Sequence, residues 1–194
     1  MDSSTILIAL GANLHSSAGT PAQTLVKALD LLGAAGLGLV ALSRFYHSPA
    51  FPAGSGPDYV NACAALTSPL PPEAVLEQLH GVEAALGRSR NRRWEARGID
   101  LDLLAQGSAI RPDPATEAHW RALPLAEQMH SAPERLILPH PRLGERAFVL
   151  IPLAEIAPRW RHPATGESVS EMVARLPMAE KAALVPFSAP FGGV

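Results

Sequence analysis

Residues 98–104 read GIDLDLL, a run in which apolar residues alternate with two aspartates. Successive side chains of a strand point to opposite faces, so Ile99, Leu101 and Leu103 point one way and Asp100 and Asp102 point the other. The run therefore predicts a half-buried strand that carries both carboxylates on its polar face.

Outward from this run, towards the N-terminus, strand and helix patterns alternate. Apolar residues recur at helical spacing over residues 71–86, and a Thr-Pro pair at residues 20–21 opens an earlier helix. The β-rich apolar runs cover residues 5–11, 37–48 and 58–67. The order β-α-β-β-α-β is the signature of a ferredoxin-like sheet with two helices on one face, which makes this an α+β fold.

The C-terminal half reads as additions to that sheet. Residues 106–134 are rich in Pro, Ala and Glu, and we interpret them as an insertion or lid with a short helix interrupted at Pro124. An extended stretch over 136–138 and a turn at 139–141 follow. Helices are expected around residues 148–156 and 168–176, and residues 186–194 are expected to be a frayed tail.

Composition indicates one compact domain over residues 1–194, because 47% of the 194 residues are hydrophobic and the formal net charge is only -2. The apolar stretch near the N-terminus, residues 6–10, is too short to cross a bilayer. The single cysteine, Cys63, lies in an apolar run and suggests a reducing compartment. We expect a cytoplasmic monomer with no membrane or nucleic-acid partner.

Five arginines lie within residues 88–97, directly before the two aspartates. Guanidinium groups pair with phosphate oxygens, and Mg²⁺ takes hard oxygen ligands from carboxylates and phosphates. Both signs of charge within fifteen residues thus favour a phosphate-rich nucleotide with Mg²⁺. A solvated strand face remains the alternative, and no glycine-rich phosphate loop occurs in the sequence.

Two further places could bind a ligand. Tyr59 and Asn61 share one face of their strand and offer an aromatic plane beside an amide, which suits a flat heterocycle. His140 lies between two prolines, and an imidazole there could bind phosphate. A packed tyrosine with a polar edge residue, and a structural turn histidine, are the simpler readings of these residues.

Taken together, six segments resemble the 6-hydroxymethyl-7,8-dihydropterin pyrophosphokinases of the folate pathway. They are residues 9–14 (ALGANL), 45–49 (FYHSP), 57–62 (PDYVNA), 87–90 (GRSR), 93–102 (RWEARGIDLD) and 138–143 (LPHPRL). The resemblance implies transfer of a pyrophosphoryl group from ATP to the hydroxymethyl oxygen of the pterin, with release of AMP. It also implies a ferredoxin-like fold.

The same resemblance implies roles for individual residues. Asp100 and Asp102 would hold two Mg²⁺ ions and, with Arg88 and Arg97, would form the catalytic set. The ATP side would comprise His80, Glu83, Arg88, Arg90, Trp94, Arg97, Arg135, His140 and Arg146. The pterin side would comprise Ser48, Pro49, Phe51, Tyr59, Asn61 and Phe148.

The chain departs from the family in two places. It spends residues 106–134 where the family often has a short turn, and Ile137 stands where some members carry a hydroxyl residue.

Two other classes of function stay open at this stage. An RNA-binding module shares the fold but would need an aromatic-rich strand motif, which the sequence lacks. A regulatory domain that binds a small molecule without catalysis would not need Asp100 and Asp102.

Overall fold

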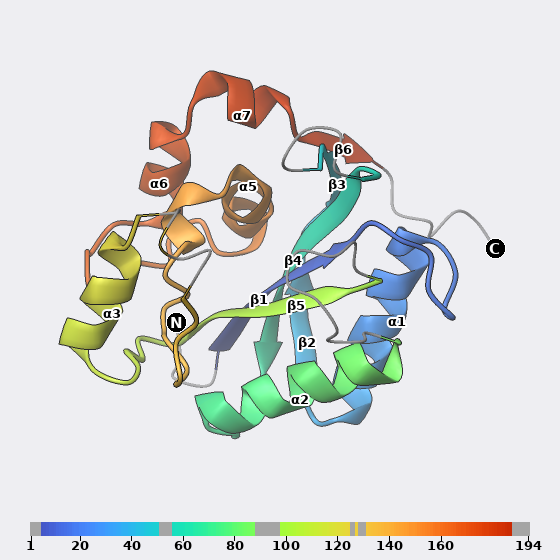
Figure 1. The fold of residues 1–194 in the computed structure, drawn as a ribbon, viewed down its shortest axis with the longest axis horizontal. Coiled ribbons are helices and arrows are strands. Elements are labelled where there is room, and N and C mark those ends of the chain that lie inside the picture. Colours follow the sequence, from blue (N-terminus) through green and yellow to red (C-terminus); the bar gives the residue numbers. More distant parts are fainter. Residues whose placement is uncertain (1–4, 51–55, 88–97, 125–126, 128–130, 188–194) are drawn as a thin grey trace.

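The computed structural model describes residues 5–50, 56–87, 98–124, 127 and 131–187, and its elements follow the expected order except that residues 37–48 hold two strands (Figure 1). The strands are β1 (Thr5–Ala12), β2 (Gly38–Leu42), β3 (Phe45–Ser48), β4 (Tyr59–Thr67), β5 (Asp100–Gln106) and β6 (Val185–Phe187). The helices are α1 (Pro21–Ala34), α2 (Pro72–Ala85), α3 (Pro114–Ala122), the 3-10 helix η1 (Leu143–Glu145), α5 (Ala147–Ile156), α6 (Val169–Arg175) and α7 (Met178–Ala182).

The strands form one antiparallel sheet in the order β5-β1-β4-β3-β6, and β2 pairs with β4 beside β3. β1 is flanked by β4 on one side and by β5 on the other. The chain is therefore a mixed α and β structure built on an antiparallel sheet, which agrees with the predicted α+β class.

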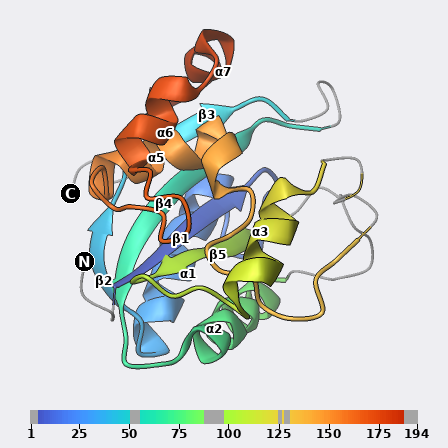
Figure 2. The same ribbon diagram turned by 90° about the vertical axis from the view of Figure 1, so that its left-hand side faces the viewer.

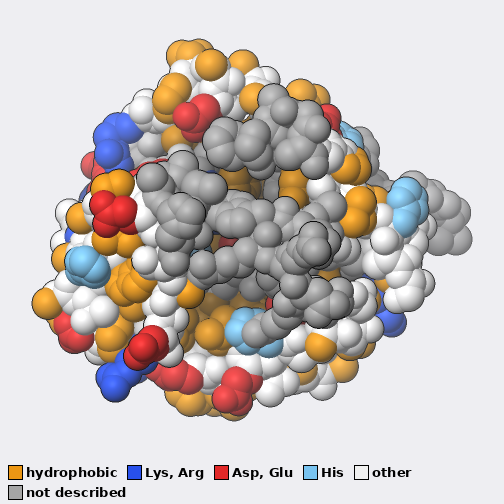
Figure 3. Space-filling view, viewed as in Figure 1, with side chains coloured by type: hydrophobic (Ala, Val, Ile, Leu, Met, Phe, Trp, Pro, Cys, Tyr) orange, Lys and Arg blue, Asp and Glu red, His pale blue; other side chains and the backbone are white. Residues whose placement is uncertain are grey.

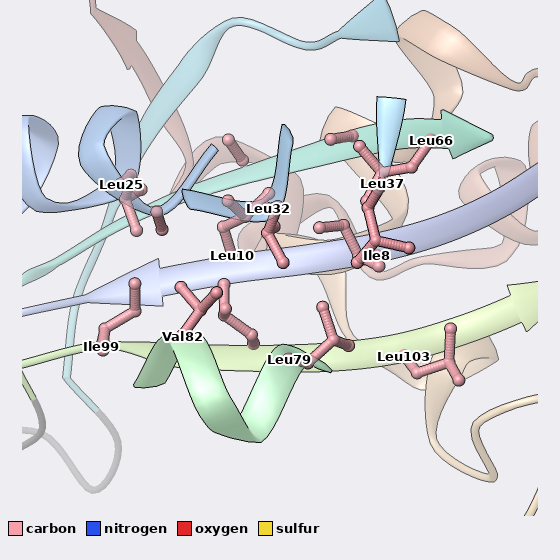
Figure 4. Packing of buried hydrophobic residues seen from close by; sticks show 14 of the residues in the cluster. Ile8, Leu10, Leu25, Leu32, Leu37, Leu66, Leu79, Val82, Ile99 and Leu103 are labelled. Carbon is pink, nitrogen blue, oxygen red and sulfur yellow. The ribbon is translucent and has the colours of Figure 1, made fainter. Parts of the chain in front are cut away.

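One face of the sheet packs against α1 and α2. Ile8 and Leu10 of β1 point into this layer together with Leu25 of α1 and Leu79 of α2 (Figure 4). The start of α1 is fixed as the sequence predicted. The Thr20 hydroxyl accepts a hydrogen bond from the Gln23 N–H, and the Gln23 side chain accepts one from the Thr20 N–H.

The opposite face is covered by the C-terminal helices, which Figure 2 shows on the other side of the sheet from α1 and α2. Leu7 and Cys63 of the sheet pack there against Val149, Leu150 and Leu153 of α5. Helices were expected over both C-terminal segments, but periodicity along a helix does not reveal which sheet face that helix covers.

Two expectations from the sequence are wrong in detail. The segment 37–48 was expected to contain one strand that ends at residues 45–46, but it contains two strands. The Ser43 hydroxyl accepts a hydrogen bond from the Cys63 N–H and donates one to the Arg44 carbonyl, which interrupts the ladder. Residues 186–194 were expected to fray, but residues 186 and 187 belong to β6, where Pro186 pairs with Tyr46 and Phe187 pairs with Phe45. Proline is tolerated there because β6 is an edge strand.

The insertion at residues 106–134 contains α3, which ends before Pro124. Arg111 pairs with Leu138 through two backbone hydrogen bonds of 2.9 and 3.2 Å, so the start of the insertion lies beside the 136–138 segment. Among the described residues, no helix is both long and apolar enough to span a membrane.

Candidate functional site

The two aspartates lie on β5, at the edge of the sheet. Leu101 and Leu103 between and after them are buried in the layer of α1 and α2, which confirms the predicted alternation. Asp100 pairs with Gly11 and Asp102 pairs with Ala9 of β1. Both carboxylates therefore lie on the face that α5 partly covers, and the Asp102 side chain keeps 34% of its surface exposed.

Glu83 of α2 holds the backbone between these aspartates. β5 is an edge strand, so the Leu101 N–H has no neighbouring strand to pair with. It donates instead to Glu83 Oε1 at 2.8 Å, and Glu83 is only 1% exposed. His80 lies one helical turn earlier on α2 and is half-buried.

Arg146 directly precedes α5 and approaches the aspartates from that side. Its Nη1 lies 3.7 Å from Asp102 Oδ2, and its guanidinium carbon lies 5.6 Å from the centre of the Phe148 ring. Burial lowers the pKa of Arg146, and the nearby Asp102 opposes this shift. The guanidinium thus stands between the acidic pair and an aromatic ring that is 37% exposed.

His140 is fixed next to β5 by its own backbone, whose N–H donates to the Leu104 carbonyl at 2.8 Å. Its Nδ1 accepts a hydrogen bond from the Arg142 N–H at 3.2 Å, which leaves the ring proton on Nε2. Burial, with help from Arg146 and Arg142, lowers the pKa of His140 to about 3. The imidazole is therefore neutral at physiological pH and offers one N–H donor.

A second group of polar residues lies two strands away on the same face. Asn61 of β4 is 5% exposed, and its Nδ2 donates to the Ser48 Oγ of β3 at 2.8 Å. Tyr59 pairs with Ser48 across the same two strands and is half-buried. Because Asn61 pairs with Gly11 of β1, only that glycine separates it from Asp100 in the sheet.

A charged cluster that the sequence did not reveal ties β3 to α5 beside this second group. Glu155 of α5 accepts hydrogen bonds from the Arg44 N–H at 2.8 Å, from Arg44 Nε at 2.7 Å and from the Tyr46 hydroxyl at 2.5 Å. Tyr46 pairs with Asn61 across β3 and β4. More than 100 residues separate Glu155 from its partners, so no local pattern could have indicated this contact.

The remaining predicted site residues are more scattered. Pro49 directly follows β3 and is exposed. Arg135 is also exposed and lies near Asp113, whose pKa is lowered mainly by hydrogen bonds from Thr116, with a contribution from Arg135. Five predicted residues lie outside the described residues, namely Phe51, Arg88, Arg90, Trp94 and Arg97.

Charge on the described surface is mixed. On the face shown in Figure 3, acidic and basic side chains of the described residues alternate near the outline of the molecule. Within the described ranges, no group of three or more His, Cys, Asp or Glu residues could enclose a metal ion.

Comparison with known proteins places this arrangement in context. Residues 7–158 match the family model described as 7,8-dihydro-6-hydroxymethylpterin-pyrophosphokinase. A relative named 2-amino-4-hydroxy-6-hydroxymethyldihydropteridine pyrophosphokinase, from Methylorubrum extorquens, is 39% identical over 84% of this chain and 90% of its own length. A protein of the same name from Haemophilus influenzae is 36% identical over 79% of this chain and 81% of its own length.

Among solved structures, the Plasmodium falciparum HPPK-DHPS wild type is similar, with a TM-score of 0.60 over 88% of this chain. Its sequence identity is 13%, so it supports the fold alone. The chain spans 44% of that longer protein.

Proposed function

We propose a location on this chain for the reaction of the 7,8-dihydro-6-hydroxymethylpterin-pyrophosphokinase family, to which the chain belongs. The chain transfers pyrophosphate from ATP to the hydroxymethyl group of 6-hydroxymethyl-7,8-dihydropterin in folate biosynthesis. We propose that this reaction takes place on the sheet face that carries Asp100, Asp102 and Asn61. One observation carries this placement: Asp100 and Asn61 both pair with Gly11, so acidic and amide side chains flank one strand on one face.

The acidic pair fits Mg²⁺. Two carboxylates on one strand face offer hard oxygen ligands, and Mg²⁺ is commonly held by one or two carboxylates together with substrate phosphates and water. We propose that Asp100 and Asp102 hold two such ions on the triphosphate of ATP. When bound, the metal supplies neutralisation of charge on the phosphate oxygens.

The nucleotide side of the proposal rests on neutral and cationic donors next to the aspartates. His140 offers its Nε2 proton, and Arg146 offers guanidinium donors that match phosphate oxygens. The family resemblance adds His80, Glu83, Arg88, Arg90, Trp94, Arg97 and Arg135 to this side. Of these, Arg88 and Arg97 are proposed to act on charge that develops during the transfer.

The pterin side consists of one polar pair and two aromatic rings. The Ser48 hydroxyl fixes the Asn61 carboxamide, so its orientation is set before a ligand arrives. We propose that Asn61 hydrogen-bonds to the amide edge of the pterin and that Tyr59 and Phe148 stack on its two faces. Pro49 and Phe51 complete this side by the family resemblance.

The transfer is a direct displacement that needs no covalent intermediate with the protein. The hydroxymethyl oxygen forms a bond to the β-phosphorus of ATP while the bond from that phosphorus to the oxygen shared with the α-phosphate breaks. AMP leaves with the bridging oxygen. Asp100 pairs with Gly11, where its carboxylate can accept the proton of the substrate hydroxyl. The neutral His140 can donate a hydrogen bond to a phosphate oxygen and keep its ring proton.

Further parts of the proposal concern the whole chain. We infer that the sheet is a ferredoxin-like one in which β2 and β3 are a single interrupted strand. The chain is proposed to be one domain with an insertion at residues 106–134. We also propose that the enzyme is a cytoplasmic monomer without membrane or nucleic-acid partners. The buried free Cys63 supports a reducing compartment.

The direct test of the reaction follows AMP formation from ATP and Mg²⁺ with and without 6-hydroxymethyl-7,8-dihydropterin. The proposal expects AMP only when both Mg²⁺ and the pterin are present, with the pyrophosphate recovered on the pterin. AMP that forms equally without the pterin would contradict it.

A further inference from the structure

Gly11 occupies the centre of the proposed site without a clear backbone reason for being glycine. It lies in β1, between Asn61 of β4 and Asp100 of β5. Its φ is not among the positive values found at other glycines of the chain, so other residues could adopt its conformation. Glycine weakens the interior of a strand, and it often marks a place where another group approaches the backbone closely.

The neighbours of Gly11 leave little room for a side chain on this face. A Cβ at position 11 would lie 3.3 Å from Asn61 Oδ1, and no other described heavy atom comes within 4 Å. Asn61 cannot move away freely, because its Nδ2 donates to Ser48 Oγ at 2.8 Å and its side chain is buried. An added methyl group would therefore push the carboxamide or fill the space above β1.

The residues of β1 on this face decrease in size towards the site. Leu7 is packed under α5, Ala9 pairs with Asp102, and Gly11 pairs with Asp100. Adjacent strands lie about 4.8 Å apart, so the backbones that carry Asn61 and Asp100 are about 10 Å apart. This span is comparable to the length of a hydroxymethylpterin measured from its exocyclic amino group to its hydroxyl oxygen.

We propose that Gly11 is a specificity-determining residue. Because it has no side chain, the backbone of β1 stays uncovered where the dihydropterin crosses it. The amide edge of the pterin lies at Asn61, and its hydroxymethyl oxygen extends over Gly11 towards Asp100. This inference rests on the proposed function. It assigns the orientation of the substrate relative to the sheet and a steric reason for excluding side chains at position 11.

The test is the variant Gly11→Ala, with Gly38→Ala as a matched control. Gly38 also lies in a strand, and a Cβ there would meet Thr67 Cγ2 at the same 3.3 Å, but it is on β2, whose pairing with β4 is at the Thr67 end of that strand. Calorimetry would measure the affinity for the pterin, with a nonhydrolysable ATP analogue present, and the affinity for the analogue alone. Thermal unfolding would compare both variants with the wild type.

We expect Gly11→Ala to weaken pterin binding by at least about tenfold, the usual effect of one misplaced methyl group in a tight site. Its affinity for the ATP analogue should stay within about twofold of the wild type, and Gly38→Ala should change neither affinity. Pterin affinity of Gly11→Ala within twofold of the wild type would overturn the proposal. An equal loss for both ligands would do so as well.

A double variant separates a displaced Asn61 from a blocked substrate and also serves if Gly11→Ala alone folds poorly. Asn61→Ala removes the only described side chain within 4 Å of the new methyl group. If the pterin crosses Gly11, adding Gly11→Ala to Asn61→Ala weakens pterin binding further. If it adds nothing, Gly11 only gives room to Asn61 and the proposed orientation is wrong. A wild type that binds no pterin would instead refute the proposed function.

Discussion

At the scale of single residues, the site depends on which face each side chain of a strand occupies. The alternation GIDLDLL was sufficient to place Asp100 and Asp102 together, because the period of a strand is two. The structure confirms that Leu101 and Leu103 take the opposite, buried face.

Replacing either aspartate with asparagine, as Asp100→Asn or Asp102→Asn, keeps the shape of the side chain and removes its charge. We expect the rate of AMP formation to fall by at least about 10²-fold, as when a main charge-stabilising group is lost. Pterin affinity should change little, since Asn61 and the aromatic rings are intact. The exposed Asp30 on α1 offers the control Asp30→Asn, which should keep full activity. An Asp102→Asn enzyme with more than a tenth of the wild-type rate would contradict the proposed role.

The residue scale also shows where sequence reasoning reached its limit. It could be predicted that Tyr59 shares a strand face with Asn61 and that Asp100 shares one with Asp102, because the members of each pair are two residues apart on one strand. The contacts of Glu155 with Arg44 and Tyr46 could not, because they join α5 to β3 across more than 100 residues. A carboxylate in the apolar sequence of α5 was the only available signal.

At the scale of elements, β5 illustrates how an edge strand can be held in place by a helix. Its Leu101 N–H would be left without a partner if Glu83 did not accept it. The peptide group in question lies between the two aspartates, so its orientation fixes the directions of both carboxylates. Glu83 thereby has a supporting role that is independent of any nucleotide contact.

Comparing Glu83→Gln with Glu83→Met separates these roles. Gln retains a carbonyl that can accept the Leu101 N–H, whereas Met is similar in length and cannot accept it. An unsatisfied buried N–H costs about 1–3 kcal/mol, so Met should lower the free energy of unfolding by about that amount and Gln by less. Hydrogen exchange at the Leu101 amide should accelerate only in the Met variant. Equal exchange in both variants would show that Glu83 does not hold this peptide.

The Glu155 cluster ties β3 to α5 and should affect stability more than chemistry. Tyr46→Phe removes the hydroxyl that donates to Glu155 and leaves the ring in place. Hydrogen bonds to charged groups contribute about 1.5–3 kcal/mol, so urea unfolding should show a loss in that range, with kcat changed by less than about threefold. A Tyr46→Phe protein as stable as the wild type would refute this role of the cluster.

At the scale of the whole molecule, the insertion is attached to the rest of the chain through polar contacts. Glu117 is the buried residue of α3, with 0% exposure, and its Oε1 accepts a hydrogen bond from Arg121 Nε at 2.9 Å. His162 Nε2 lies 3.7 Å from the same oxygen. Trp160 Nε1 also donates to the Gly107 carbonyl at 3.0 Å. This helix therefore meets the rest of the chain beside a buried histidine, His162.

Burial lowers the pKa of His162, with Glu117 and Glu167 opposing the shift and Arg121 adding to it. Below the ordinary histidine pKa of 6.5, the unfolded chain takes up a proton that the folded chain resists, so stability is full above that pH and falls as the pH drops. One proton of difference is worth about 1.4 kcal/mol per pH unit. His162→Gln should therefore reduce the fall of the urea midpoint as the pH drops below about 6.5. His15→Gln, at an exposed position, is the control.

Most strands and helices up to β5 could be predicted from the sequence, because each segment there has its own hydrophobic period and its own end signals. The contacts made by the segments after β5 could not be predicted. The pairing of β6 with β3 joins Phe187 to Phe45, and the packing of α5 on the second sheet face brings Arg146 to Asp102. Both depend on contacts between distant segments, which local patterns do not encode.

The central claim is that Asp100 and Asp102 together bind the divalent cations that accompany ATP. A crystal of the protein with Mn²⁺, a nonhydrolysable ATP analogue and the pterin, measured at the manganese absorption edge, tests it directly. The account predicts anomalous peaks that contact both carboxylates and the phosphates of the analogue. Manganese elsewhere, with Asp102 still paired to Arg146, would contradict it.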